Sequence, residues 1–256
     1  MIKTAIQKYL QTTGQKRMDV RTAMFDMDGV LYDSMRNHAS CWHRTMEHFG
    51  FTFPEWEAYM HEGRTGAGTI NIVSMRERGH LATDEECEAM YHYKSKLFEQ
   101  CPEAKPMPGA YELLKKVKGV GVTPVIVTGS GQKVLLQRLQ RSFPGIFRQE
   151  LMVTAYDVKK GKPDAEPYLM GLEKGGRFLN ADGGRLQPWQ SVVIENAPLG
   201  VQAGVAAGVF TIAVNTGPLP DEVLYQAGAN ILYPSMQALA DGWEELLDSL
   251  KSVVSD

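Results

Sequence analysis

The chain has 256 residues, 43% of them hydrophobic, which is enough for one large or two modest domains with a sizeable core. Its 27 basic and 30 acidic residues give a formal net charge of −3, so the charge gives no indication of nucleic-acid binding. The N-terminal apolar stretch contains Lys3 and Lys8, so we expect no signal peptide. Glycines interrupt the longest apolar run, residues 199–214, so we expect no membrane span.

The cysteines also bear on where the protein works. Cys41, Cys87 and Cys101 lack the spacing of a metal site, and three cysteines cannot all pair within one chain. Their number and spacing favour a reducing compartment, so we expect a cytoplasmic protein. We expect a monomer, although the sequence leaves the oligomeric state open.

The first hundred residues are predicted to be mostly helical around one strand. Apolar residues at helical spacing predict a short helix over residues 2–11, and the apolar residues 23–25 predict the first core strand. Helical periodicity over residues 36–49 and 69–78 predicts two further helices, each followed by a glycine. Thr83 and Glu86 form a capping-box pattern, so another helix is predicted from there to about residue 100.

The remainder of the chain alternates between apolar strands and helices. After a proline-rich linker at residues 101–109, the pattern predicts strands at 124–127, 151–154, 191–194, 209–214 and 231–233. The helices between and after them are predicted at 110–118, 133–142, 166–173, 200–207 and 236–250. This alternation predicts an α/β fold, a doubly wound, Rossmann-like parallel sheet. We expect residues 1–34 and 104–256 to form this core, with residues 35–103 inserted as a helical cap domain.

Two acids stand at the end of the first predicted strand. In an extended chain, Asp26 and Asp28 point to the same side, and Gly29 permits a sharp turn after them. Two carboxylates this close either share a cation or differ in pKa, and both arrangements suit catalysis. The alternative is an ordinary acidic turn after an edge strand.

A hydroxyl-rich turn follows the second predicted strand. Thr128, Gly129 and Ser130 stand between that strand and the next helix, where hydroxyl and backbone N–H groups can bind phosphate. The alternative is that Thr128 or Ser130 simply caps the helix.

Two later strands also end in polar residues. Lys162 precedes Pro163, which cannot continue a strand, so the lysine is predicted to lie at a turn. Glu195 and Asn196 follow the strand at 191–194 and offer the oxygen ligands that Mg²⁺ prefers. The alternatives are a solvated basic loop and a pair of helix-capping residues. In doubly wound sheets, all these strand ends lie at the ligand-binding edge.

Taken together, these motifs resemble those of the haloacid dehalogenase superfamily of phosphotransferases. FDMDGVLYDS matches the first superfamily motif, VTGS the second, KKGKPDAEPY the third and VIENAPLGVQAG the fourth. The helical insertion is similar to the cap of the β-phosphoglucomutase and phosphoglycolate phosphatase branch. His38 and Trp42 are similar to the His and Trp of that branch's first cap helix.

The resemblance implies a role for each residue. Asp26 would be the nucleophile that accepts the phosphoryl group, and Asp28 the general acid and base. Thr128 and Lys162 would hold phosphate oxygens. Mg²⁺ would be bound by Asp26, the Asp28 carbonyl and Asn196, with Glu195 nearby. Residues implied to contact the substrate are Gly129, Ser130, His38, Trp42, Arg64 and Lys94.

Two positions depart from the family pattern. Asn196 stands where the family usually has Asp, so the predicted Mg²⁺ site carries one negative charge fewer. Arg64 is shifted by two residues from the arginine with which β-phosphoglucomutases bind the far phosphate of their substrate. The first departure makes metal affinity uncertain and the second weakens the mutase interpretation.

The sequence therefore favours a Mg²⁺-dependent phosphatase that acts on a small sugar phosphate or a similar metabolite through an aspartyl-phosphate. A β-phosphoglucomutase is the nearest alternative, because both activities share the aspartyl-phosphate step. A third alternative is a catalytically weak binding protein, because Asn196 reduces the negative charge of the predicted metal site. A phosphoryl-accepting receiver domain is disfavoured by Asp28 and by the helical insertion.

Overall fold

The computed structural model describes residues 2–129 and 135–255, and its centre is a parallel β-sheet. Within these residues the sheet has six strands in the order β3-β2-β1-β4-β5-β6. Every pair of neighbouring strands is parallel. Their bounds are β1 Thr22–Phe25, β2 Thr123–Val127, β3 Met152–Val153, β4 Ser191–Glu195, β5 Phe210–Val214 and β6 Ile231–Tyr233. The fold is therefore the predicted α/β parallel sheet.

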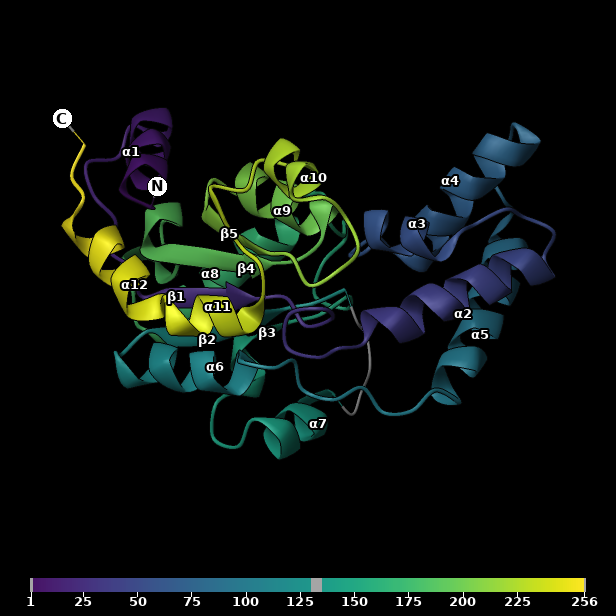
Figure 1. Cartoon of the computed structure of the whole chain (residues 1–256), viewed down its shortest axis with the longest axis horizontal. Helices are drawn as coiled ribbons and strands as arrows, with labels where there is room; N and C mark the ends of the chain where they lie inside the picture. The colour runs from purple at the N-terminus through teal and green to yellow at the C-terminus, as the bar shows by residue number, and fades with distance from the viewer. Residues whose placement is uncertain (1, 130–134, 256) are drawn as a thin grey trace.

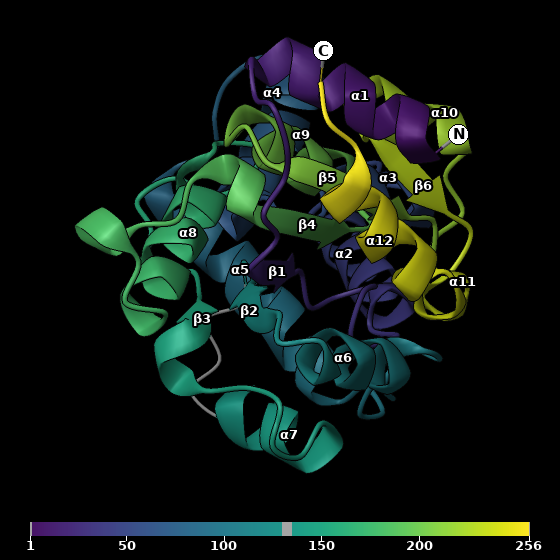
Figure 2. The same ribbon diagram turned by 90° about the vertical axis from the view of Figure 1, so that its left-hand side faces the viewer.

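Helices cover both faces of this sheet (Figure 1). The helices on one face are α1 Ile2–Thr13, α6 Ala110–Gly119, α7 Leu135–Ser142, α11 Met236–Asp241 and α12 Trp243–Ser252. The other face packs against α8 Glu166–Phe178 and α9 Pro198–Ala206, with α10 Asp221–Gln226 beside α9. Figure 2 shows the strands crossing the molecule from β3 to β6 with α8 and α6 on opposite sides. Burial on both faces explains why the strands read as continuous apolar runs in the sequence.

The segment between β1 and α6 forms a separate group of helices, seen at the right of Figure 1. These are α2 Met35–His48, α3 Glu55–Met60, α4 Gly66–Arg78 and α5 Asp84–Glu99. They enclose their own hydrophobic cluster, which includes Met46, Phe53, Ile70 and Val73 and is distinct from the clusters of the sheet. None of the described helices is long and apolar enough to cross a membrane.

Apart from shifts at the ends of elements, the structure differs from the prediction in two short helices and one divided helix. Helix α3 was not predicted, because one and a half turns are too short to show a period. Helix α10 is equally short and was also not predicted. The predicted helix at 236–250 is two helices, α11 and α12, which meet at Gly242.

The strand order reverses beside β1, which is the first strand of the chain. The chain passes from β1 to β2 and β3 on one side and then returns to β4, the other neighbour of β1. Asp26 directly follows β1, and Glu195 is the last residue of β4. The reversal therefore creates the edge where ligands bind in doubly wound sheets.

Candidate active site

The acidic turn after β1 is held by backbone hydrogen bonds. The N–H of Asp26 donates to the carbonyl of Ile194 at 3.1 Å, so β1 stays paired with β4 up to the first acid. Gly29 then adopts a φ of +78°, a conformation that favours glycine. A Cβ on Gly29 would also lie 2.1 Å from Nδ2 of Asn196. Gly29 thus permits both the turn and the close approach of the fourth motif.

Lys162 joins the first and fourth motifs. Its Nζ contacts Oδ1 of Asp26 and lies 2.5 Å from Oε1 of Glu195, and all three side chains are buried. Tyr168 on α8 donates its hydroxyl to the same Oε1 at 2.8 Å. Oε2 of Glu195 accepts the backbone N–H of Asn196 at 3.0 Å. Glu195 therefore fixes the lysine ammonium against Asp26.

The buried charges strongly shift the pKa of Asp26. Burial raises this pKa to about 7, and the neighbouring carboxylates of Glu195 and Asp28 add to the rise, while Lys162 opposes it. Burial alone would lower the pKa of Lys162, but Asp26 and Glu195 together raise it. One ammonium thus faces several carboxylates, and this corner of the site favours additional positive charge.

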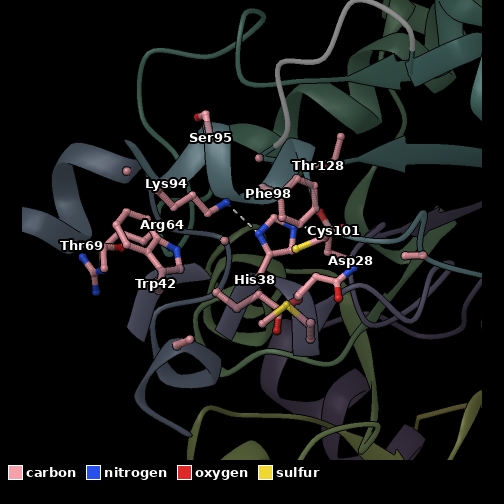
Figure 3. Close-up of a pocket in the computed structure, with 18 of the residues that line it drawn as sticks. Asp28, His38, Trp42, Arg64, Thr69, Lys94, Ser95, Phe98, Cys101 and Thr128 are labelled. Atoms are coloured by element: carbon pink, nitrogen blue, oxygen red, sulfur yellow. Dashed lines mark hydrogen bonds and ion pairs between the residues drawn. The ribbon is translucent and has the colours of Figure 1, made fainter. Parts of the chain in front are cut away.

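Asp28 faces the helical segment. Its Oδ1 accepts the Ser34 hydroxyl at 2.5 Å and lies 3.5 Å from Nε2 of His38. Burial would raise the pKa of Asp28, but His38, Ser34 and Lys94 together lower it to about 2. Lys94 on α5 reaches Nδ1 of His38 at 2.9 Å, as the dashed line in Figure 3 shows. The side chains of Asp28, His38 and Lys94 thus form a chain from the sheet edge to α5.

The hydroxyl-rich turn lies at the end of β2. Thr128 is buried, and its N–H donates to the carbonyl of Val153 at 2.9 Å, which holds the turn against the end of β3. Gly129 approaches the carbonyl of Gly63 in the helical segment, since a Cβ there would lie 3.6 Å from that oxygen. Ser130 lies outside the described residues. Thr128 and Gly129 line the same pocket as Asp26 and Asp28.

A further carboxylate, which the motif analysis missed, reaches the site from the helical segment. Oε2 of Glu62, in the loop between α3 and α4, accepts a hydrogen bond from Nδ2 of Asn196 at 2.9 Å. Oε1 of Glu62 and Oδ1 of Asn196 are both buried without a hydrogen-bond partner among the described residues. Burial raises the pKa of Glu62 well above its ordinary value. Sequence patterns did not reveal this contact, because Glu62 lies outside the four motifs and 134 residues from Asn196.

These oxygens fit a hard divalent cation. Glu62 and Asn196 offer carboxylate and amide oxygens at one buried contact, and one oxygen of each has no hydrogen-bond partner among the described residues. Asp26 lies close enough to raise the pKa of Glu62. Glu62 would supply the negative charge that Asn196 lacks relative to Asp. Glu195 contributes less directly, because Lys162, Tyr168 and backbone N–H groups already occupy its oxygens.

A pocket of about 1030 Å³ lies between the sheet edge and the helical segment. His38, Trp42, Arg64 and Lys94 all line it, as Figure 3 shows. The Lys94 ammonium lies 4.7 Å from the Phe98 ring centre and 5.6 Å from that of Trp42. Nε of Arg64 is buried without a hydrogen-bond partner among the described residues.

The structure therefore brings the described members of the predicted site together. Asp26, Asp28, Thr128 and Gly129 line the pocket from the core side, and the four predicted residues of the helical segment line it from the other. Lys162, Glu195 and Asn196 are connected to the pocket wall through Asp26 and Glu62.

Comparison with known proteins agrees with this geometry. The hexitol phosphatase A of Escherichia coli is 31% identical over 195 residues, covering 75% of this chain and 82% of that protein. A phosphorylated carbohydrates phosphatase of Thermotoga maritima is 29% identical over 246 residues, covering 92% of this chain and all of that protein. A structure from Bacteroides vulgatus, provisionally described as a β-phosphoglucomutase, is 58% identical with a TM-score of 0.92. It covers 98% of this chain and 99% of that one.

The match to a family extends over most of the sheet and the whole helical segment. Residues 23–214 match the family described as haloacid dehalogenase-like hydrolase, a range that begins in β1 and ends with β5. All four motifs lie inside this range. The chain is therefore an enzyme that belongs to the haloacid dehalogenase-like hydrolase family.

Proposed function

We propose that this enzyme is a phosphatase that transfers the phosphoryl group of a small phosphorylated metabolite to water through Asp26. The observation that supports it most is the buried contact of Lys162 with Asp26 at the sheet edge, directly beneath the pocket. A nucleophilic carboxylate beside a fixed ammonium is suited to phosphoryl transfer, because the transition state is stabilised mainly by positioning and positive charge.

In the proposed first step, a carboxylate oxygen of Asp26 attacks phosphorus, and the bond from phosphorus to the leaving oxygen breaks. Asp28 donates a proton to that leaving oxygen. In the second step Asp28 takes a proton from water, and the oxygen of that water displaces Asp26 from phosphorus. Thr128 and Lys162 hold the phosphate oxygens in both steps.

The contacts of Asp28 favour its ionised form over its protonated form. Ser34 and His38 hold the carboxylate in its ionised form, the form that accepts a proton. Donation of a proton would require Asp28 to leave these two partners, because its pKa rises once their hydrogen bonds are lost. We therefore propose that Asp28 alternates between the His38 contact and the reacting phosphate.

We propose that Mg²⁺ is held by Asp26, the Asp28 carbonyl and Asn196, with Glu62 as a further oxygen donor. When bound, the ion would neutralise charge on the phosphate and on the attacking carboxylate. Glu195 then acts mainly as a positioning residue for Lys162.

We propose that residues 35–103 form a cap domain that selects the substrate. Arg64 and Lys94 line the pocket and would bind the end of the substrate away from the transferred phosphate. Trp42 and His38 would pack against its middle. Phosphatase activity is favoured over mutase activity because the described relatives from E. coli and T. maritima are phosphatases. We further propose a cytoplasmic monomer.

The test is a turnover screen with Mg²⁺ over phosphate compounds whose leaving groups differ in size. The panel would hold hexose phosphates, polyol phosphates, small phosphorylated acids and inorganic pyrophosphate, with release of inorganic phosphate as the readout. A parallel assay would supply β-glucose 1-phosphate with a bisphosphate primer and follow glucose 6-phosphate. Glucose 6-phosphate formed much faster than free phosphate, and that rate lost in Arg64→Ala, would show a mutase instead.

A further inference from the structure

Two of the cysteines meet where the helical segment joins the core. Cys41 lies on α2, and Cys101 follows the end of α5 in the chain that leads back to the sheet. Their sulfur atoms are 3.5 Å apart, although 60 residues separate them in sequence. Cys87 lies near the start of α5 in the hydrophobic cluster of the helical segment, with Asn71 as its polar neighbour. The pair is therefore one specific contact and not part of a larger thiol cluster.

The two thiols differ in their access to solvent. Cys101 is partly exposed and lines the pocket, where Figure 3 shows its sulfur beside His38 and Phe98. Cys41 is only 1% exposed. A small oxidant that enters the pocket can therefore reach Cys101 but not Cys41. Burial and the neighbouring Cys101 raise the pKa of the Cys41 thiol to about 12, so Cys41 is the protonated member of the pair.

We propose that Cys41 and Cys101 form a reversible disulfide and that this pair is a redox-sensitive modification site. A peroxide oxidises the sulfur of Cys101 to a sulfenic acid, and the peroxide is reduced to water or an alcohol. The Cys41 thiol then attacks this sulfur, the S–S bond forms, and the sulfenic oxygen leaves as water. A dithiol reductant restores both thiols by exchange. In a reducing compartment such a bond would be transient.

The bond would act on the part of the segment that contacts Asp28. His38 lies three residues before Cys41 on α2, and Phe98 lies three residues before Cys101. The rings of His38 and Phe98 stack with centres 4.2 Å apart. Joining the two sulfurs would tie α2 to the end of α5 at this stack, and it would restrain the motion of His38 and Lys94 relative to Asp28. This effect on turnover rests on the proposed function, whereas formation of the bond does not.

The test is oxidation of the full chain with hydrogen peroxide, followed by thiol titration after unfolding and by peptide mapping. We expect loss of two of the three thiols, one linked peptide that joins Cys41 to Cys101, and full recovery with dithiothreitol. Because a disulfide restricts the unfolded chain, we also expect a higher unfolding temperature for the oxidised form. On a substrate found in the screen, we expect oxidation to lower turnover reversibly.

Matched variants separate this proposal from general thiol damage. Cys87→Ser should form the same link between Cys41 and Cys101, and Cys101→Ser should retain both of its titratable thiols after oxidation. Cys41→Ser should form no link and retain only the Cys87 thiol, because Cys101 would remain a sulfenic acid. Three titratable thiols after oxidation, a link through Cys87, or a link between two chains would overturn the modification site. A disulfide that leaves turnover unchanged would overturn its effect on Asp28. Absence of turnover in the reduced enzyme would instead count against the proposed function and leave the thiol result intact.

Discussion

At the scale of single residues, the charge of the site is set by several buried carboxylates that surround one lysine ammonium. Asp26, Glu195 and Glu62 come from three separate segments, and Lys162 is the ammonium that contacts two of them. Asp28 has different partners, Ser34 and His38, which lower its pKa although it lies close enough to raise that of Asp26. The two acids of the first motif therefore have different pKa values, and this difference supports distinct roles for them in catalysis.

The first prediction compares these two acids. We expect Asp26→Asn to abolish turnover, because the amide cannot attack phosphorus. We expect Asp28→Asn to slow turnover by roughly two to four decades, the usual contribution of general acid–base catalysis. Release of inorganic phosphate would measure both, with circular dichroism as the control for folding. Activity retained in Asp26→Asn would indicate direct attack by water.

The second prediction concerns the cation site. We expect Glu62→Gln to weaken Mg²⁺ binding by roughly tenfold, because the affinity of such sites follows the charge of their ligands. Adding Asn196→Asp to that variant should restore much of the Mg²⁺ affinity, because the carboxylate lost at residue 62 is replaced by one at residue 196. The dependence of unfolding temperature on Mg²⁺ concentration would measure this without turnover. Glu99→Gln, which removes a carboxylate elsewhere in the pocket wall, is the matched control and should change little.

At the scale of elements, the strand ends are held in place by close packing and by local hydrogen bonds. Helix α9 begins inside the fourth motif, two residues after Asn196, and Gly200 in its first turn allows it to approach Glu195. The loop after β3 is fixed by Asp157, whose carboxylate accepts the N–H and the hydroxyl of Thr154 at 2.8 Å each. These contacts hold the loop after β3 and allow α9 to pack against Glu195.

The third prediction tests the packing of α9. A Cβ at Gly200 would lie 1.8 Å from Oε1 of Glu195, so Gly200→Ala must displace the carboxylate that holds Lys162. We expect a loss of stability of about 1–3 kcal/mol, as in other overpacked sites, together with loss of turnover. Gly119→Ala at the end of α6 is the control, because a Cβ there meets no atom within 4 Å. Equal stability of the two variants in urea would contradict this account of Gly200.

The fourth prediction concerns pH. Burial would raise the pKa of Asp157, but Lys174 at 2.6 Å and the groups of Thr154 lower it. Because folding lowers this pKa, the carboxylate stabilises the fold above its ordinary pKa, and that stability is lost as pH falls through the lowered value. We expect Asp157→Asn to cost about 1 kcal/mol at neutral pH and less in acid. Urea unfolding across pH would show whether the difference between the two proteins shrinks on acidification.

At the scale of the whole molecule, the helical segment and the sheet have separate hydrophobic clusters. Val73 belongs to the cluster of the helical segment, and Val193 belongs to a cluster that packs α8 and α9 on the sheet. The pocket lies between the sheet edge and the helical segment, so its shape depends on how the two parts are held together. The Glu62–Asn196 hydrogen bond is one direct polar contact across it.

The fifth prediction tests this independence. Val73→Ala and Val193→Ala each remove two methyl groups from a fully buried side chain, and each should cost about 1–3 kcal/mol. Because the two sites share no packing partners, the cost of the double variant should equal the sum to within roughly 0.5 kcal/mol. Urea unfolding of the four proteins would give the coupling energy. A coupling well above that limit would mean that the two clusters behave as one core.

The sequence by itself was sufficient for the fold and for the residues at the strand ends. Apolar strands alternating with helices leave few arrangements other than a covered parallel sheet, and such a sheet gathers the ends of its strands on one edge. Asp26, Thr128, Lys162 and Asn196 could therefore be selected before any contact was known. Short helices such as α3 were missed, because a period needs several turns to be visible.

Only the tertiary structure decided which charges meet. Glu62 lies outside the four motifs, and its contact with Asn196 arises because the helical segment folds back onto the sheet edge. The same folding brings Lys94 to His38 and Cys41 to Cys101 across more than fifty residues. Local patterns specify elements over a few residues, whereas these pairs depend on the placement of one group of helices against another. The spacing of residues along the chain does not predict that placement.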